Sequence, residues 1–244
     1  MSSLFPVATV LAVGLGAGIR HAMESDHLAA VATLVVRRAS WTEAARLGAF
    51  WGLGHTLTLA LVGGSMLALG QVVPERAADG LELLVGVMLV LLGLDCLRRL
   101  RAGLLHEHVH RHGDGEVHVH RHFHLSQQRK SPAHRHLHLD REWLRATVVG
   151  MVHGLAGSAA LVLLAVGVTS TPLVGLGYVA VFGAGSIVGM ALLALAIGLG
   201  LKLTAGWAAW PYRMLAVGMA LFSCVLGAWT VWRIGFAGGL LIGA

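Results

Sequence analysis

The stretch VLAVGLGAGIRHAMESDHLAAVATLVV, residues 10–36, decides the fold class, because it places ionisable side chains inside an apolar segment. Five of the eight residues from Arg20 to His27 are ionisable, and apolar chain flanks them on both sides. A charge at the centre of a bilayer costs at least about 2.5–3.5 kcal/mol on insertion scales, so such a cluster marks a functional site by default. The alternative is a short hydrophilic turn between two half-helices at the membrane surface. The apolar residues that continue as far as Val36 argue against that alternative.

The rest of the sequence has the composition of a membrane protein. Of its 244 residues, 56% are apolar and only 12% are charged, and this charged share is about half that of a soluble domain. A membrane helix needs about 20 mostly apolar residues, so six helices would use about 120. We therefore expect an all-α polytopic protein of the cell (inner or plasma) membrane, with the lipid bilayer as a partner. Apolar stretches of spanning length lie at about 4–36, 45–70, 81–97, 146–168, 173–201 and 214–232.

The net charge of +6 is concentrated in one loop. Residues 98–145 contain ten Lys/Arg, five Asp/Glu and 11 of the 15 histidines, so the rest of the chain is nearly neutral. A basic loop between membrane segments is no nucleic-acid footprint, and we expect no nucleic-acid partner. The loops on the same side of the membrane as residues 98–145 carry 15 Lys/Arg, whereas the opposite side carries two. The positive-inside rule therefore predicts a cytoplasmic histidine-rich loop and both termini outward.

The two halves of the chain resemble each other weakly. A shift of 132 residues places His21 on His153, and a shift of 131 places the stretch WGLGH of residues 51–55 on FGAGS of residues 182–186. Three membrane segments followed by three more put the second set upside down. This is the inverted-repeat plan of secondary transporters, whose binding site lies near the bilayer midplane between the repeats. We predict a first repeat at 1–100, a cytoplasmic loop at 101–143 and a second repeat at 144–244.

Histidines beside small residues recur in three of the apolar segments. His21 and His27 lie with Asp26 in the first, His55 in the second and His153 in the fourth. Each alone reads as a hydrogen-bonded packing residue, but together they favour one shared polar site. Imidazole and carboxylate are ligands for nickel, cobalt or zinc. On an ideal helix, however, Asp26 and His27 lie about 140° and 240° around the axis from His21. Either the helix is broken here, or only some of the three bind metal while the others orient them.

The pattern His21-x4-Asp26-His27 within RHAMESDHLAAVATL, followed by FWGLGHT and MVHGLAGSAAL, resembles the nickel/cobalt transporter superfamily. Within it, the closest resemblance is to the short six-segment branch of urease-associated high-affinity nickel permeases. The resemblance implies that the helix bearing His21, Asp26 and His27 selects and transports the metal. Glu24 stands where the family has an acid two residues before the Asp. The family's later Phe-Asp-Thr motif is missing, because residues 182–186 are FGAGS, which removes the acidic residue of that segment.

The histidines of the loop alternate with other residues in three runs. Period two places each run on one face of an extended strand, and the glycines of Gly113-Asp114-Gly115 indicate a hairpin between the first two runs. The alternative is a disordered tract, because small isolated hairpins are marginally stable in water. In either form the loop is suited to buffer, hand over or sense metal. Its histidines are His106, His108, His110, His112, His118, His120, His122, His124, His134, His136 and His138.

We interpret the chain as a secondary transporter that takes up divalent nickel or cobalt as its substrate, with no prosthetic group. His21, Asp26, His27 and His55 would bind the metal, His153 would contribute from the second repeat, and Glu24 with Arg20 would balance charge or couple protons. The resemblance adds cytosolic nickel chaperones of urease or hydrogenase maturation as partners. The chain lacks the sequence G-x4-G-K-[ST], so ATP hydrolysis is not supported.

Three other functions stay open at this point. Metal efflux would use the cytoplasmic loop to collect excess metal. An intramembrane metalloenzyme would use Glu24 as a general base, but no nucleophile motif or soluble catalytic domain accompanies the ligands, and we expect no enzyme. A storage or sensing protein would need the loop alone and would leave the cluster around His21 unexplained.

Overall fold

The structure is a computed structural model that describes residues 7–36, 40–71, 73–101, 106–111, 117–122, 139–168, 171–207 and 209–242. Within these residues the chain is helical except for one small hairpin. The helices are α1 (Val7–His21), α2 (Ser25–Val35), α3 (Trp41–Thr58), α4 (Gly64–Ala68), α5 (Glu75–Arg101), α6 (Leu139–Val168), α7 (Pro172–Trp207) and α8 (Ala209–Val231), with π-helical turns η1 (Leu59–Gly63) and η2 (Trp232–Ala237).

The helices follow the six apolar stretches that hydropathy predicts. Four of them are long and apolar enough to span a membrane among the described residues, namely Trp41–Met66, Glu75–Arg101, Leu173–Thr204 and Trp210–Ala237. The first stretch is divided between α1 and α2, of 15 and 11 residues. At about 1.5 Å per residue, neither half alone reaches across a hydrocarbon core of about 30 Å. The chain is therefore a helical membrane protein whose first segment is discontinuous.

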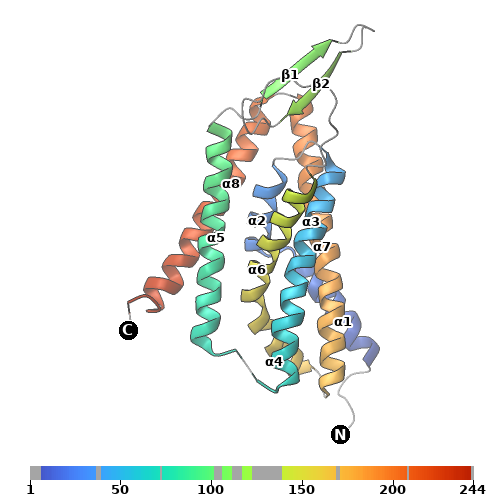
Figure 1. The fold of residues 1–244 in the computed structure, drawn as a ribbon, viewed down its shortest axis with the longest axis vertical. Helices are drawn as coiled ribbons and strands as arrows, with labels where there is room; N and C mark the ends of the chain where they lie inside the picture. Colours follow the sequence, from blue (N-terminus) through green and yellow to red (C-terminus); the bar gives the residue numbers. More distant parts are fainter. Residues whose placement is uncertain are drawn as a thin grey trace.

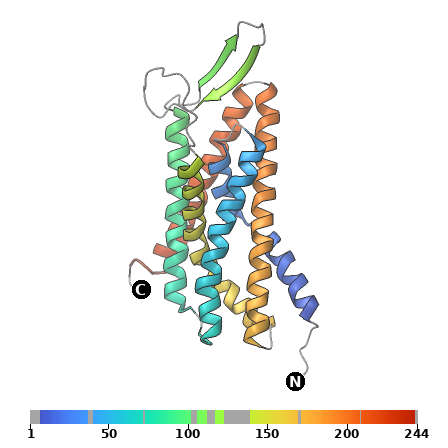
Figure 2. The same cartoon turned by 45° about the vertical axis from the view of Figure 1, so that its right-hand side comes forward.

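Helix α3 packs on α6 and α7, while α1 packs on α7 and α5 packs on α8. Figures 1 and 2 both show α3 running beside α7. Glycines allow these backbones to approach closely. A Cβ on Gly54 would lie 2.1 Å from the Thr147 carbonyl oxygen of α6, and a Cβ on Gly18 would lie 2.0 Å from the Phe182 carbonyl oxygen of α7. Small residues at contact positions are typical of packing between membrane helices.

The outer surface of the bundle is apolar. Leu53, Leu57 and Leu61 follow one another at four-residue spacing along α3 and η1, and each is about half exposed. A soluble protein rarely leaves such a contiguous apolar surface in water. Contact with lipid chains accounts for it, in agreement with the membrane assignment.

A hairpin of β1 (His106–Arg111) and β2 (Val117–His122) belongs to the histidine-rich loop. The strands are antiparallel, and the register pairs His106 with His122, His108 with His120 and His110 with His118. Of the two forms left open for the first two histidine runs, the described residues thus have the hairpin, and the all-α description holds only for the membrane part. Figure 1 shows the hairpin beyond the end of the bundle that lies opposite the N-terminus. The predicted loop histidines that lie outside the described residues are His112, His124, His134, His136 and His138.

Candidate metal-binding site

The helix break between α1 and α2 brings the ionisable residues of the first segment to one place. Helix α1 ends at His21, and the backbone N–H groups of Met23 and Glu24 donate to the carbonyls of Arg20 and His21 at 2.9 and 3.1 Å, which closes the last turn. Glu24 is extended, with φ −64° and ψ 152°, and α2 begins at Ser25. Of the two arrangements that the sequence allowed, the structure thus has the broken helix. The break falls between His21 and Ser25, and the glycines upstream of it lie within α1.

Four histidines from three membrane segments meet at this break. The Nε2 atoms of His21 and His55 lie 3.3 Å apart, and the ring of His27 has its centroid 4.4 Å from that of His21 and 4.2 Å from that of His153. His27, His55 and His153 are 0–2% exposed. The turn between half-helices that we considered at the membrane surface exists, but His27 beyond it is buried in the bundle and the His21 side chain before it is only 17% exposed.

The Asp26 carboxylate holds two of these rings. Its Oδ1 lies 3.0 Å from Nδ1 of His27 and its Oδ2 lies 2.9 Å from Nε2 of His153. The backbone N–H of His27 also donates to Oδ1, at 2.9 Å. Asp26 stands in the first turn of α2, where the helix dipole stabilises a negative charge. It therefore fixes the orientation of one imidazole on its own helix and one on α6.

Glu24 orients a third ring, that of His21. Its Oε2 lies 3.1 Å from Nδ1 of His21, although the Glu24 side chain is 57% exposed and stands at the edge of the cluster. Arg20, predicted to balance charge, is exposed on the last turn of α1. All six residues of the membrane segments that the sequence predicted for the metal site thus lie in or at the edge of one cluster. They are His21, Glu24, Asp26, His27, His55 and His153.

The Asp26 carboxylate leaves the far nitrogens of His27 and His153 free to accept. In a neutral imidazole the nitrogen that faces a carboxylate carries the proton, and the other nitrogen carries a lone pair. The far nitrogens of His27 and His153, Nε2 and Nδ1, are buried and have no hydrogen-bond partner among the described residues. A buried polar atom without a hydrogen-bond partner costs about 1–3 kcal/mol of stability. Metal-binding histidines commonly donate their other N–H to a carboxylate in this manner.

The donor atoms are close enough to share one cation. Those of His21, His27 and His55 lie within 4.8 Å of one another, and so do those of Asp26, His27 and His153. Two nitrogens that each stand about 2.0–2.1 Å from a tetrahedral ion are about 3.3 Å apart. The 3.3 Å between the Nε2 atoms of His21 and His55 matches that separation.

Trp51 is a member of the site that the sequence argument did not assign. Its side chain is fully buried, and its ring centroid lies 5.3 Å from that of His27 and 5.4 Å from that of His153. Its spacing could have assigned it to the site from the sequence, because residues four apart on a helix share a face and Trp51 precedes His55 by four. The indole forms an apolar wall on one side of the histidines.

One curated relative decides the family of the chain. The urease accessory protein UreH of Bacillus sp. (strain TB-90) is 32% identical over 197 residues, which cover 81% of this chain and 79% of that protein. This chain belongs to the UreH family of urease accessory proteins. No protein-family profile matches the chain, and no solved structure matches it. Membership of the UreH family, together with the helical membrane fold, places the chain among accessory and transport proteins and not among enzymes.

Proposed function

We propose that this UreH-family protein takes up divalent nickel or cobalt across the membrane through the histidine cluster. The observation that carries the proposal is a cluster of four imidazoles, three of them buried, in which Asp26 and Glu24 each contact ring nitrogens and leave donor atoms close together. Imidazole nitrogen suits nickel, cobalt and zinc, whereas magnesium and calcium prefer oxygen ligands. The urease accessory relative and the resemblance to urease-associated permeases favour nickel.

His21, His27 and His55 would hold the metal, and Asp26 would act chiefly by orienting His27 and His153. Both oxygens of Asp26 already face an imidazole nitrogen, so a metal bound directly to Asp26 would have to displace one of them. His153 would join when the carboxylate rotates. Glu24 stands at the edge of the cluster and would hold His21 in place.

The membrane part would consist of two inverted repeats, residues 1–100 and 144–244. Close backbone contacts support this plan, because they recur under the shift of 131–132 residues that relates the two halves. An added Cβ on Gly18 would meet the Phe182 carbonyl at 2.0 Å, and one on Gly150 would meet the Trp51 carbonyl at 2.0 Å. The shift carries Gly18 onto Gly150 and Trp51 onto Phe182.

The ring contacts of the site support the same relation. His21 lies against Phe182 at 5.3 Å between centroids, and its counterpart His153 lies against Trp51 at 5.4 Å. The correspondence ends at the ligands, because Ser186 of the second half stands where the first half has a histidine. The site would therefore lie between the repeats but draw most of its ligands from the first.

The charge distribution supports a cytoplasmic loop and outward termini. The loop would then receive or buffer metal on the inner side, and the histidines that the register of β1 and β2 pairs across the hairpin would serve that purpose. Cytosolic nickel chaperones of urease or hydrogenase maturation would collect the metal from it.

Nickel flux tests the proposed function. Cells that express the wild-type protein should accumulate radiolabelled nickel, and His21→Ala should reduce the initial rate by at least about tenfold, while His106→Ala, the same change within the loop, should not. Lower accumulation with wild type than with empty cells would assign efflux instead. Equal accumulation by wild type and His21→Ala would remove the transport role from the cluster.

A further inference from the structure

A cavity of about 250 Å³ runs between α5 and α8 and ends at Asp26. Its wall on α5 is formed by Glu82, Val85 and Leu89, at spacings of three and four residues that place them on one helix face. The facing wall comes from the last turns of α8 and from η2, between Leu226 and Arg233. The cavity therefore lies between two helix faces, in the parts of α5 and α8 that Figure 1 shows toward the end of the bundle that carries the C-terminus.

The inner end of the cavity reaches the histidine cluster through one side chain. Ser25 and Asp26 line that end, and the Asp26 side chain is 36% exposed, in contrast to the buried rings of His27 and His153 that it holds. Asp26 is thus the point at which a cation in the cavity would first meet the cluster.

An ion pair stands at the other end of the cavity. Glu82 of α5 accepts a hydrogen bond from the Arg233 guanidinium of η2, and both side chains are about half exposed. The pair joins the two helices that form the walls. Its Glu82 carboxylate attracts a divalent cation, whereas its Arg233 guanidinium repels one, so an arriving cation competes with Arg233 for Glu82.

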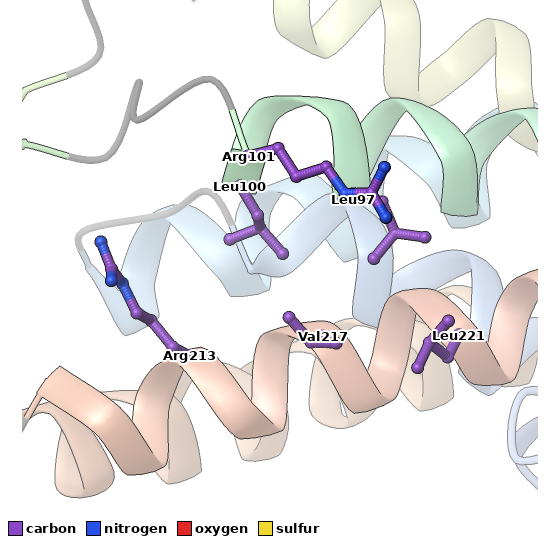
Figure 3. A pocket seen from close by; sticks show the side chains of 6 residues that line it. All are labelled: Leu97, Leu100, Arg101, Arg213, Val217 and Leu221. Atoms are coloured by element: carbon purple, nitrogen blue, oxygen red, sulfur yellow. The ribbon is translucent and has the colours of Figure 1, made fainter.

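A second cavity between α5 and α8 has the opposite electrostatic character. It lies at the other end of the two helices, has a volume of about 430 Å³, and is lined by Arg101 and Arg213 with four apolar residues. Figure 3 shows the two arginines extending from the two helices, with leucine and valine side chains between them. The described residues that line this second cavity include no carboxylate. Two guanidinium groups repel a divalent cation, so the cavity at Asp26 is the one that suits it.

We propose that the cavity between Glu82 and Asp26 is the access route for the hydrated divalent cation, with the Glu82–Arg233 ion pair as its gate. Glu82 receives the cation when the pair opens, Val85 and Leu89 offer it no ligand between the two carboxylates and so leave it hydrated, and Asp26 receives it beside the imidazoles. The route opens on the side of the chain termini, which the charge distribution places outside the cell. The inference deepens the proposed transport function and rests on it.

Chemical accessibility tests the route without measuring transport. In full-length protein with Cys96→Ala and Cys224→Ala, a cysteine at Thr230, which lines the cavity, should react with a membrane-impermeant cationic thiol reagent applied from outside. Nickel ions should slow that reaction at least about threefold. The matched control is Val225→Cys, a neighbouring position on α8 that is 68% exposed on the surface outside the cavity.

Opening the gate should change the same reaction. Arg233→Gln opens the pair and leaves the Glu82 carboxylate in place, so it should speed modification of the Thr230→Cys variant, whereas Glu75→Gln, on α5 but outside the cavity, should not. Equal reactivity at positions 225 and 230, or reaction at position 230 only from the inside, would overturn the proposed route. Absence of nickel flux in the wild-type protein would instead contradict the transport function, and the accessibility results would still test the route.

Flux measurements give an independent result for Glu82. Loss of its charge at the mouth should raise the KM for nickel by about tenfold and leave kcat nearly unchanged, since clefts of one charge raise local cation concentration. The double variant Glu82→Arg, Arg233→Glu restores the pair and should recover part of the loss. A Glu82→Gln variant with the same KM as Glu75→Gln would refute the role of the carboxylate.

Discussion

At the scale of single residues, the site depends on carboxylates that orient imidazoles. His21, His27 and His153 each have one ring nitrogen within 3.1 Å of an oxygen of Glu24 or Asp26. The sequence predicted which residue types would meet, because ionisable groups in an apolar segment are costly unless they serve a function. It did not predict that Asp26 faces two rings at once. That contact joins α2 to α6, and the spacing within one helix contains no information about it.

Asp26→Asn should weaken nickel binding by about 10–100-fold, the usual loss when a carboxylate that orients a metal-bound histidine is removed. The amide keeps the shape of the side chain but carries no charge, so the proton positions on His27 and His153 are no longer fixed. Calorimetric nickel titration of the detergent-purified protein measures the change, with Asp79→Asn of α5 as the control. Unaltered affinity in Asp26→Asn would show that the carboxylate does not act through the rings.

Trp51→Ala should destabilise the protein by about 3–5 kcal/mol, the range for truncating a buried large aromatic side chain. Trp51 is fully buried against His27 and His153, and a smaller residue leaves a void beside them. Trp51→Phe should retain most of the stability. The midpoint of thermal unfolding in detergent distinguishes the two variants, and a midpoint for Trp51→Ala equal to that of wild type would contradict this packing role.

At the scale of elements, hydropathy located the membrane segments but not the break within the first. The expected stretch of about 4–36 contains both α1 and α2. Residues 22–24, Ala-Met-Glu, include no glycine or proline that would indicate a turn. The glycines upstream of the break, Gly14 and Gly18, lie inside α1, where a Cβ would come within 3.0 Å of α7. Their absent side chains serve helix contact, and only the tertiary packing reveals that use.

Gly150→Ala should separate α6 from α3 and lower the thermal midpoint markedly, because the added Cβ would lie 2.0 Å from the Trp51 carbonyl oxygen. The matched control is Gly16→Ala on α1, whose Cβ would have no atom within 4 Å. Alanine favours a helix over glycine by about 1 kcal/mol, so the control should be neutral or stabilising. Equal midpoints for the two variants would show that the close contact between α3 and α6 is not needed.

At the scale of the whole molecule, the membrane fold follows from composition, while the arrangement around the site does not. Length, hydropathy and charge predicted helical segments and a histidine-rich loop between two halves. Which helices pack together was beyond those signals, because apart from the few ionisable residues the segments are apolar around most of their circumference. The hairpin was one of two forms left open, since alternation of histidine predicts a strand only where the chain is ordered. Strands β1 and β2 supply that order.

The topology predicts opposite labelling of two introduced cysteines, in protein that carries Cys96→Ala and Cys224→Ala. Ser2→Cys should react with an impermeant thiol reagent in intact cells, and Ser126→Cys in the loop should react only after the membrane is opened. The physical reason is the excess of Lys/Arg on the loop side, which is retained in the cytoplasm. The reverse pattern would place the route at Glu82 on the inner side.

The most direct test of the central claim is nickel X-ray absorption on purified full-length protein whose eleven loop histidines are replaced by asparagine. The account predicts one tightly bound nickel ion with about three imidazole ligands, and loss of that ion in the matching His27→Ala variant. Absence of bound nickel, or an identical spectrum after His27→Ala, would contradict a metal site built from the buried histidines.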